Sequence, residues 1–138
     1  MSQDILVTQA INDYAKGDFD KAETLFRQVL SMDPAHAQSL YFLGLIASGK
    51  GVFDEASRLL YQATLLEPNN ADYAYSLAVV LQENNKEQEA VDIYKKLPNM
   101  PESWNNLGNI ALSKNDFEQA FACFDKALEL NPKMIWAM

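Results

Sequence analysis

The chain has 138 residues, of which 49% are hydrophobic and 22% are charged. This is about the length of one domain, and five Gly and five Pro residues are too few for a collagen-like or low-complexity chain. The formal net charge of −8 repels nucleic-acid phosphates and anionic lipid head groups, so we expect neither as a partner.

Targeting and redox signals are weak. The longest run without a charged residue, 34–49, contains polar side chains and is shorter than the about 20 apolar residues of a membrane span. The N-terminus carries Asp4 where a secretory signal needs basic residues. We therefore expect a cytoplasmic protein without a membrane-spanning helix. The single cysteine, Cys123, cannot form an internal disulfide and is too few for a structural metal site.

Residues of the same kind recur along the chain every 34 positions. Ala22 aligns with Ala56 and Ala90, while the last segment repeats the marks after 30 positions, as from Leu77 to Leu107. A fixed period of this kind indicates a repeat array. We expect one domain, 1–138, with repeats at 3–36, 37–70, 71–100 (four residues short) and 101–134, and with 135–138 opening a fifth.

Each repeat is expected to be an antiparallel pair of helices. The first repeat departs most from the pattern, because its first helix carries Gln9 and Asp13 among the apolar positions, as is typical of a terminal repeat. In the second repeat, Gly44 stands where the two helices would cross. The third repeat lacks four residues, so we expect its second helix, about Glu87 to Leu97, to be one turn (about 5.4 Å) short.

The fourth repeat shows the pattern most clearly. Trp104, Leu107, Gly108 and Ala111 recur at i, i+3, i+4 and i+7, which predicts one face of a helix. A second apolar stripe follows the turn at Asn115. The turns of the four repeats hold Gly or Asn, residues that suit a left-handed backbone at a helix end, and the pairs Asp-Pro, Glu-Pro and Asn-Pro are expected to end second helices.

These marks resemble the tetratricopeptide repeat (TPR) family. The fourth repeat has Trp104-Asn-Asn-Leu107-Gly108, then Ala120, Phe124 and Pro132, in the family's order of Trp, Leu-Gly, Ala, aromatic and Pro. The resemblance covers essentially the whole chain. It implies an all-α fold, a right-handed superhelical solenoid of antiparallel helix pairs, with a concave groove that binds a protein or peptide.

Helical spacing on the first helix of each repeat selects the residues expected to face this groove. They are Gln38, Tyr41, Leu45, Asp72, Tyr75, Val79, Gln82, Glu102, Asn105 and Asn109, with Asn106 beside them. The set contains no Lys, Arg or His, whereas the family's chaperone-binding members clamp a terminal carboxylate with Lys, Arg and Asn. Its acids favour a neutral or basic peptide or helix with apolar anchors rather than an acidic one.

Two features of this surface have two interpretations each. Tyr41 and Tyr75 are one repeat apart and could form a ladder of rings for a ligand, or could pack at helix joints with wet hydroxyls. The cluster of Asn105, Asn106 and Asn109 could hold a peptide backbone or could be solvated. One repeat with Asn is not a ladder, because other side chains stand at the matching positions of the neighbouring repeats.

No constellation for catalysis, a cofactor or a metal is recognised. Cys123 lies on an apolar stripe and is expected to be buried, while the only histidine, His36, belongs to a distant connection and is not placed to act as a base for it. We therefore expect a chain that is not an enzyme.

The sequence leaves three hypotheses for the function open, and the end of the chain motivates two of them. Ile135, Trp136 and Met138 begin an unfinished helix pair, so the chain could be a piece of a longer array, or this face could be covered by another subunit. The first hypothesis is a protein-interaction module. The second is the N-terminal, substrate-presenting part of a sugar or methyl transferase, and the third is a scaffold that self-associates through its last residues.

Overall fold

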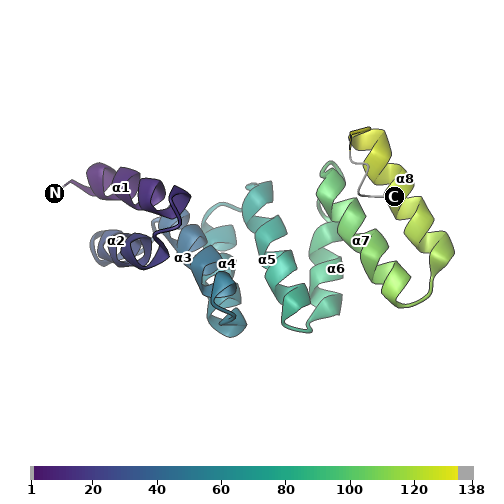
Figure 1. Ribbon diagram of the computed structural model, residues 1–138, viewed down its shortest axis with the longest axis horizontal. Helices are drawn as coiled ribbons and strands as arrows, with labels where there is room; N and C mark the ends of the chain where they lie inside the picture. The colour runs from purple at the N-terminus through teal and green to yellow at the C-terminus, as the bar shows by residue number, and fades with distance from the viewer. Residues whose placement is uncertain (1, 134–138) are drawn as a thin grey trace. The chain divides into compact units, whose positions relative to one another are not determined.

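The computed structural model describes residues 2–133, which form eight α-helices and contain no strand (Figure 1). The all-α fold class predicted from the sequence is therefore confirmed for the described residues. The chain divides into two compact units, Met1–Asn85 and Lys86–Met138. Residues 135–138, the predicted start of a fifth repeat, lie outside the described residues.

Unit 1 consists of the first five helices, which are α1 (Gln3–Ala15), α2 (Phe19–Met32), α3 (Ala37–Gly49), α4 (Phe53–Leu66) and α5 (Ala71–Glu83). Helix α1 packs on α2 and α3 packs on α4, and these pairs are joined by contacts of α2 with α3. Ala22 and Phe26 of α2 are completely buried, and they join Leu43 of α3 in one hydrophobic core. The pairwise packing is the arrangement expected from the repeats.

Unit 2 contains α6 (Glu87–Lys95), α7 (Pro101–Ser113) and α8 (Phe117–Leu130). Helices α7 and α8 form a closely packed pair, and α6 packs on α7. Ala111 of α7 and Ala120, Phe124 and Ala127 of α8 form the core of this pair, with Trp104 packed against it. These residues belong to the two apolar stripes found in the sequence.

The turns inside the helix pairs have the left-handed backbone that their residues predicted. The φ angles are 84° at Gly17, 77° at Gly51, 63° at Asn85 and 61° at Asn115. Only Gly adopts this conformation freely, and Asn is the side chain that tolerates it best. Small residues also stand at the helix crossings, since a methyl group on Gly44 would lie 2.7 Å from Cγ of Leu60.

Helix α6 is shorter than its counterparts. It has nine residues, whereas α2, α4 and α8 have fourteen each. The sequence predicted a helix to about Leu97, but α6 ends at Lys95, because Pro98 disfavours helical geometry in the residue before it. The indole N–H of Trp104 donates to the carbonyl oxygen of Pro98 at 2.8 Å, which ties the segment after α6 to α7.

Candidate functional site

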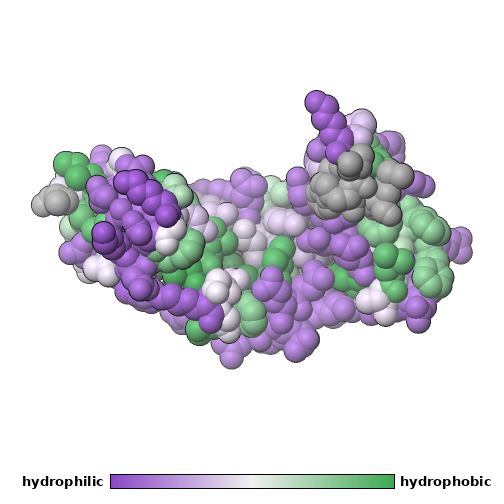
Figure 2. Space-filling view, in the orientation of Figure 1, coloured by the Kyte–Doolittle hydropathy of each residue, from purple (hydrophilic) through white to green (hydrophobic). Residues whose placement is uncertain are grey.

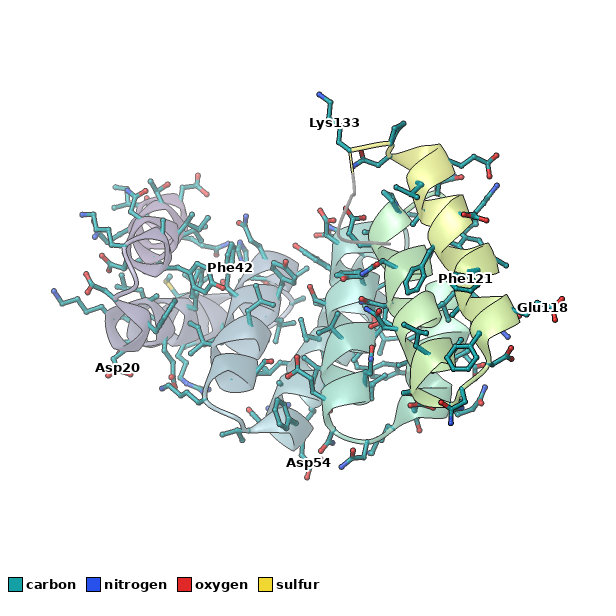
Figure 3. The ribbon with its side chains drawn as sticks, turned by 45° about the vertical axis from the view of Figure 1, so that its right-hand side comes forward. Asp20, Phe42, Asp54, Glu118, Phe121 and Lys133 are labelled. Carbon is teal, nitrogen blue, oxygen red and sulfur yellow. The ribbon has the colours of Figure 1, made fainter. Side chains whose placement is uncertain are left out.

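A row of aromatic rings joins four helices of unit 1. Phe42 of α3 stacks on Phe26 of α2 (5.1 Å between centroids, 6° between planes) and meets Tyr14 of α1 edge-on at 5.0 Å. Tyr41 contacts Phe42 at 5.3 Å and stacks on Tyr73 of α5 at 4.6 Å. Figure 3 labels Phe42, which extends from α3 towards α1 and α2. Aromatic contacts of this kind add to simple burial, so the row holds the surface of α3 in one arrangement.

The ring that stacks on Tyr41 is Tyr73, which the sequence pattern did not single out. Tyr73 is 8% exposed, and burial, together with the nearby charge of Glu67, raises the pKa of its phenol. Tyr41 and Tyr75 are both half-buried. The packing interpretation of Tyr41 therefore has a named partner, while a ligand-binding ladder of Tyr41 and Tyr75 stays a prediction.

A small apolar pocket of about 190 Å³ lies at the C-terminal end of α3. It is lined by Tyr14, Phe19, Leu45, Ile46, Gly49 and Lys50. Tyr14 and Phe19 meet edge-on at 5.2 Å, and burial raises the pKa of Tyr14. Leu45 was predicted to face a ligand. Hydrophobic surface lies in the region of α3 (Figure 2).

The cation at this pocket is already paired. Nζ of Lys50 lies 2.8 Å from Oε1 of Glu23 and 3.3 Å from Oδ1 of Asp20, and Arg27 also contacts Glu23 at 3.1 Å. The hydrogen bond from Lys50 is the main reason why the pKa of Glu23 is lowered. Lys50 therefore contributes its aliphatic stem to the pocket while its charge is balanced by α2.

A second, polar pocket of about 570 Å³ lies at the opposite end of α3. Its lining includes Gln38, another predicted ligand-facing residue, with Asp33, His36, Glu67 and Tyr73. His36 begins α3: its Nδ1 accepts the backbone N–H of Ser39 at 3.2 Å and lies 2.8 Å from the Ser39 hydroxyl. The sequence placed His36 in a connection but did not reveal that it caps the helix.

The three asparagines of unit 2 have different surroundings. Asn105 is 5% exposed, and its Oδ1 has no hydrogen-bond partner among the described residues. Asn106 donates from Nδ2 to the hydroxyl of Tyr94 at 3.1 Å, whereas Asn109 is exposed. A joint role for the three in holding a peptide backbone stays a prediction, and Asn109 offers the most surface for it.

The remaining residues predicted to face a ligand divide by exposure. Asp72 is exposed, while Val79, Gln82 and Glu102 are half-buried. All of them lie on the first helix of a repeat, on α5 or α7. Burial alone does not show whether these residues contact a ligand, so this set remains a prediction.

Between residues 2 and 133, no group of three or more His, Cys, Asp or Glu side chains is placed to hold a metal ion. Cys123 is 2% exposed, as its position on an apolar stripe predicted, and burial raises the pKa of its thiol. No helix in the described part of the chain has the length and apolar character needed to cross a membrane.

Comparisons with known proteins agree with the repeats. Two tetratricopeptide repeat family models match, one over residues 13–79 and the other over residues 101–134. No curated protein matches the chain by sequence.

Solved structures match at low sequence identity. A crystal structure of MamA protein has a TM-score of 0.85 at 23% identity, covering 98% of this chain and 76% of that one. MamA from Desulfovibrio magneticus RS-1 has a TM-score of 0.86 at 22% identity, with coverages of 97% and 78%. A tetratricopeptide repeat protein from Parabacteroides merdae ATCC 43184 has a TM-score of 0.85 at 24% identity, with coverages of 98% and 56%. These likenesses concern the fold.

Proposed function

Because the chain belongs to the tetratricopeptide repeat family, we propose that it is a protein-interaction scaffold that binds a neutral or basic peptide or helix on the first helices of its repeats. In unit 1 the binding surface is formed by α1 and α3, with Gln38, Tyr41 and Leu45 in contact with the partner. Asp72, Tyr75, Val79 and Gln82 extend it on α5. Glu102, Asn106 and Asn109 form the corresponding surface of α7 in unit 2, and Asn105, which is buried, lies on the same helix.

The apolar pocket beside Leu45 is the main support for this proposal. Its volume of about 190 Å³ is below the roughly 300 Å³ at which pockets for whole small molecules begin. It suits one large apolar side chain of a partner. Tyr14 and Phe19 form rigid walls through their edge-on contact, so little ordering is needed when an anchor residue enters.

The charges near this surface support a partner that is not acidic. Lys50, the one charged residue among the described residues that line the pocket, is paired with Asp20 and Glu23. Asp4 and Asp72, which lie on the first helices α1 and α5, are exposed. A carboxylate on the partner would be repelled by these acids, whereas Lys or Arg next to the apolar anchor would be attracted.

Gly49 provides a direct test of the pocket. A methyl group on Gly49 would meet nothing within 4 Å, although Gly49 lines the pocket. Gly49→Leu should therefore add a large apolar side chain at the pocket wall and narrow the pocket, and Gly49→Ala should leave most of it open. Both variants remove a helical Gly, so both should be at least as stable as the original chain.

The binding measurement begins with peptide display on the full chain. Selected peptides should carry one large apolar residue with neutral or basic neighbours. Their dissociation constants, measured by fluorescence anisotropy, should rise at least tenfold with Gly49→Leu and less than threefold with Gly49→Ala. If the Gly49→Leu variant stays folded by circular dichroism but binds every selected peptide as tightly as the original chain does, this surface is not the binding site.

A further inference from the structure

Unit 2 contains a pocket that is larger than the apolar pocket beside Leu45 and that the proposed function does not use. Its volume is about 460 Å³, and it opens between α6, α7 and the start of α8. The apolar part of its lining consists of Val91, Trp104, Leu107, Ile110 and Ala111, and the polar part consists of Gln88, Lys95, Lys114 and Gln119. The pocket therefore combines an apolar floor with two cations and two amides.

The aromatic wall of this pocket is held in place. Trp104 packs against the core of the α7–α8 pair, and its indole N–H is used by the carbonyl oxygen of Pro98 at 2.8 Å. The ring thus cannot turn without losing a hydrogen bond. A wall fixed in this way lowers the entropy that binding must overcome.

The described residues that line the pocket include two lysines and no carboxylate. Nζ of Lys114 lies 2.8 Å from Oε1 of Glu87, but both side chains are open to solvent, 61% and 39% exposed. Such an exposed pair contributes little and can exchange partners. Lys95 is exposed, and in the part of the chain that the structure describes it forms no ion pair. The pocket therefore has positive charge that is not neutralised within its own lining.

In unit 1, at the corresponding contact between α2 and α3, the lysine charge is neutralised by acidic side chains. Lys50 follows α3 as Lys114 follows α7, and Arg27 occupies in α2 the repeat position of Lys95 in α6. In unit 1, Lys50 contacts Glu23 at 2.8 Å and Asp20 at 3.3 Å. The acids needed for these ion pairs come from α2.

Unit 2 lacks these two acids. The repeat position of Glu23 is occupied by Val91, and that of Asp20 by Gln88, so α6 offers no carboxylate to Lys114 from inside the pocket. Glu87, at the first residue of α6, provides the pair at the rim instead. The joint of unit 2 thus keeps the cations of the joint in unit 1 and replaces its acids with an apolar and an amide side chain.

We propose that this pocket binds an acidic partner peptide, with one large apolar side chain placed against Trp104 and Leu107 and a neighbouring carboxylate placed between Lys95 and Lys114. The partner supplies the carboxylate that Glu23 supplies in unit 1. This site is separate from the surface of α1 and α3 and does not depend on the function proposed for it. Its ligand has the opposite charge, so the two sites select different partners.

The test uses three fluorescein-labelled peptides of equal length with blocked ends. The first has a central Phe flanked by two Glu, the second has the Phe flanked by two Gln, and the third has a central Ala flanked by two Glu. Fluorescence anisotropy with the full chain should give binding of the first that is at least tenfold tighter than that of the other two. Binding should weaken as sodium chloride is raised, because the attraction is electrostatic.

Val91→Glu is the decisive variant, because it rebuilds the arrangement of unit 1. The new carboxylate should pair with Lys114 and occupy the place of the ligand, so the affinity for the first peptide should fall at least tenfold. Val91→Gln is the matched control, because glutamine has nearly the shape of glutamate without its charge. It should weaken binding of the first peptide less than Val91→Glu does, and the difference between the two variants gives the effect of the carboxylate. Thermal melting followed by circular dichroism should show both variants folded, with Val91→Glu the more stable of the two.

The lysines give a second, independent measurement. Lys95→Gln and Lys114→Gln should each lower the affinity for the first peptide at least threefold. The control is Lys126→Gln, which lies on α8 outside the pocket lining and should not lower this affinity. Equal affinity for the Glu-flanked and Gln-flanked peptides, or unchanged affinity in a folded Val91→Glu variant, overturns the proposal. So does light scattering that shows a dimer abolished by Val91→Glu, because the pocket would then be filled by a second copy of the chain.

Discussion

Gly108 of α7 faces the ring of Phe124 in α8 so closely that a methyl group on Gly108 would lie 2.5 Å from Cε1 of that ring. The crossing of the two helices is therefore set by the absence of a side chain at this position. In the equivalent crossing of unit 1, a methyl group on Gly44 would meet Cγ of Leu60 at 2.7 Å. A methyl group on Gly44 would also lie 3.3 Å from the backbone carbonyl oxygen of Ala56, and Leu60 is completely buried, so neither crossing has room for a larger residue.

Gly108→Ala is expected to destabilise the second unit. Overpacking against Phe124 should lower the free energy of unfolding by about 1–3 kcal/mol, and the gain in helix propensity of up to about 1 kcal/mol will offset only part of this loss. Gly44→Ala should also destabilise its unit, because Leu60 is completely buried and the backbone oxygen of Ala56 is close by. Urea denaturation followed by circular dichroism measures both, and equal stability of Gly108→Ala and the original chain would contradict the close contact.

Two neighbouring glycines should respond to the same substitution with opposite signs. Gly51 has a φ of 77°, so Gly51→Ala forces a left-handed backbone that costs about 1–2 kcal/mol. Gly49 is the last residue of α3 and has open space around it, so Gly49→Ala should stabilise the protein by about 0.5–1 kcal/mol. The melting temperatures of the two variants measure both effects. Unchanged stability of Gly51→Ala would contradict the left-handed turn, and a loss of stability in Gly49→Ala would contradict the open space at Gly49.

The ion pairs of Lys50 should make the stability of unit 1 depend on pH. The hydrogen bond from Lys50, with help from Arg27, lowers the pKa of Glu23 from its ordinary value of 4.5. Ionised Glu23 therefore favours the folded state above pH 4.5, and this contribution is lost as the pH falls through the lower pKa of the folded protein. The side chain is 27% exposed, so the effect should stay below about 1 kcal/mol.

Glu23→Gln provides the measurement. The difference in unfolding free energy between this variant and the original chain should be largest near pH 6, should shrink towards pH 3, and should be reduced by added salt. Glu118 of α8, which points away from its unit (Figure 3), serves as the control through Glu118→Gln. A difference for Glu23→Gln that does not vary between pH 6 and pH 3 would exclude the ion pairs as its cause.

The cap formed by His36 should contribute to stability through its Nδ1. His36→Ala removes the acceptor for the backbone N–H of Ser39 and should cost about 1 kcal/mol. His36→Asn restores an acceptor at the start of α3 and should recover most of this loss. Urea titration at pH 8 measures both variants, and identical stabilities of the Ala and Asn variants would show that capping is not the role of His36.

The repeats allowed most of the fold to be predicted, because their marks depend on local geometry. Gly17 and Asn115 indicated left-handed turns, and Gly44 and Gly108 indicated close crossings, since these residues satisfy backbone requirements that few others meet. The end of α6 was placed two residues too late. Leu97 is apolar and fits the helical pattern, but the following Pro98 restricts its backbone.

The surfaces could be predicted only in part. Leu45 and Gln38 were expected to face a ligand, and each lines a pocket, but the stacking of Tyr41 on Tyr73 was not foreseen. The ion pair of Lys50 with Glu23 joins residues 27 positions apart. Such pairs depend on how two helices meet and on which rotamers fit there, which the period of a sequence does not determine.

Trp104 also gives the chain a built-in optical reporter. The sequence contains two tryptophans, so Trp136→Phe leaves Trp104 as the sole source of indole emission. Its ring forms part of the wall of the pocket in unit 2, and its N–H is already bound to Pro98. A change in its emission wavelength would therefore report the polarity of whatever enters beside it, and occupancy could be followed in unlabelled protein during a stopped-flow experiment.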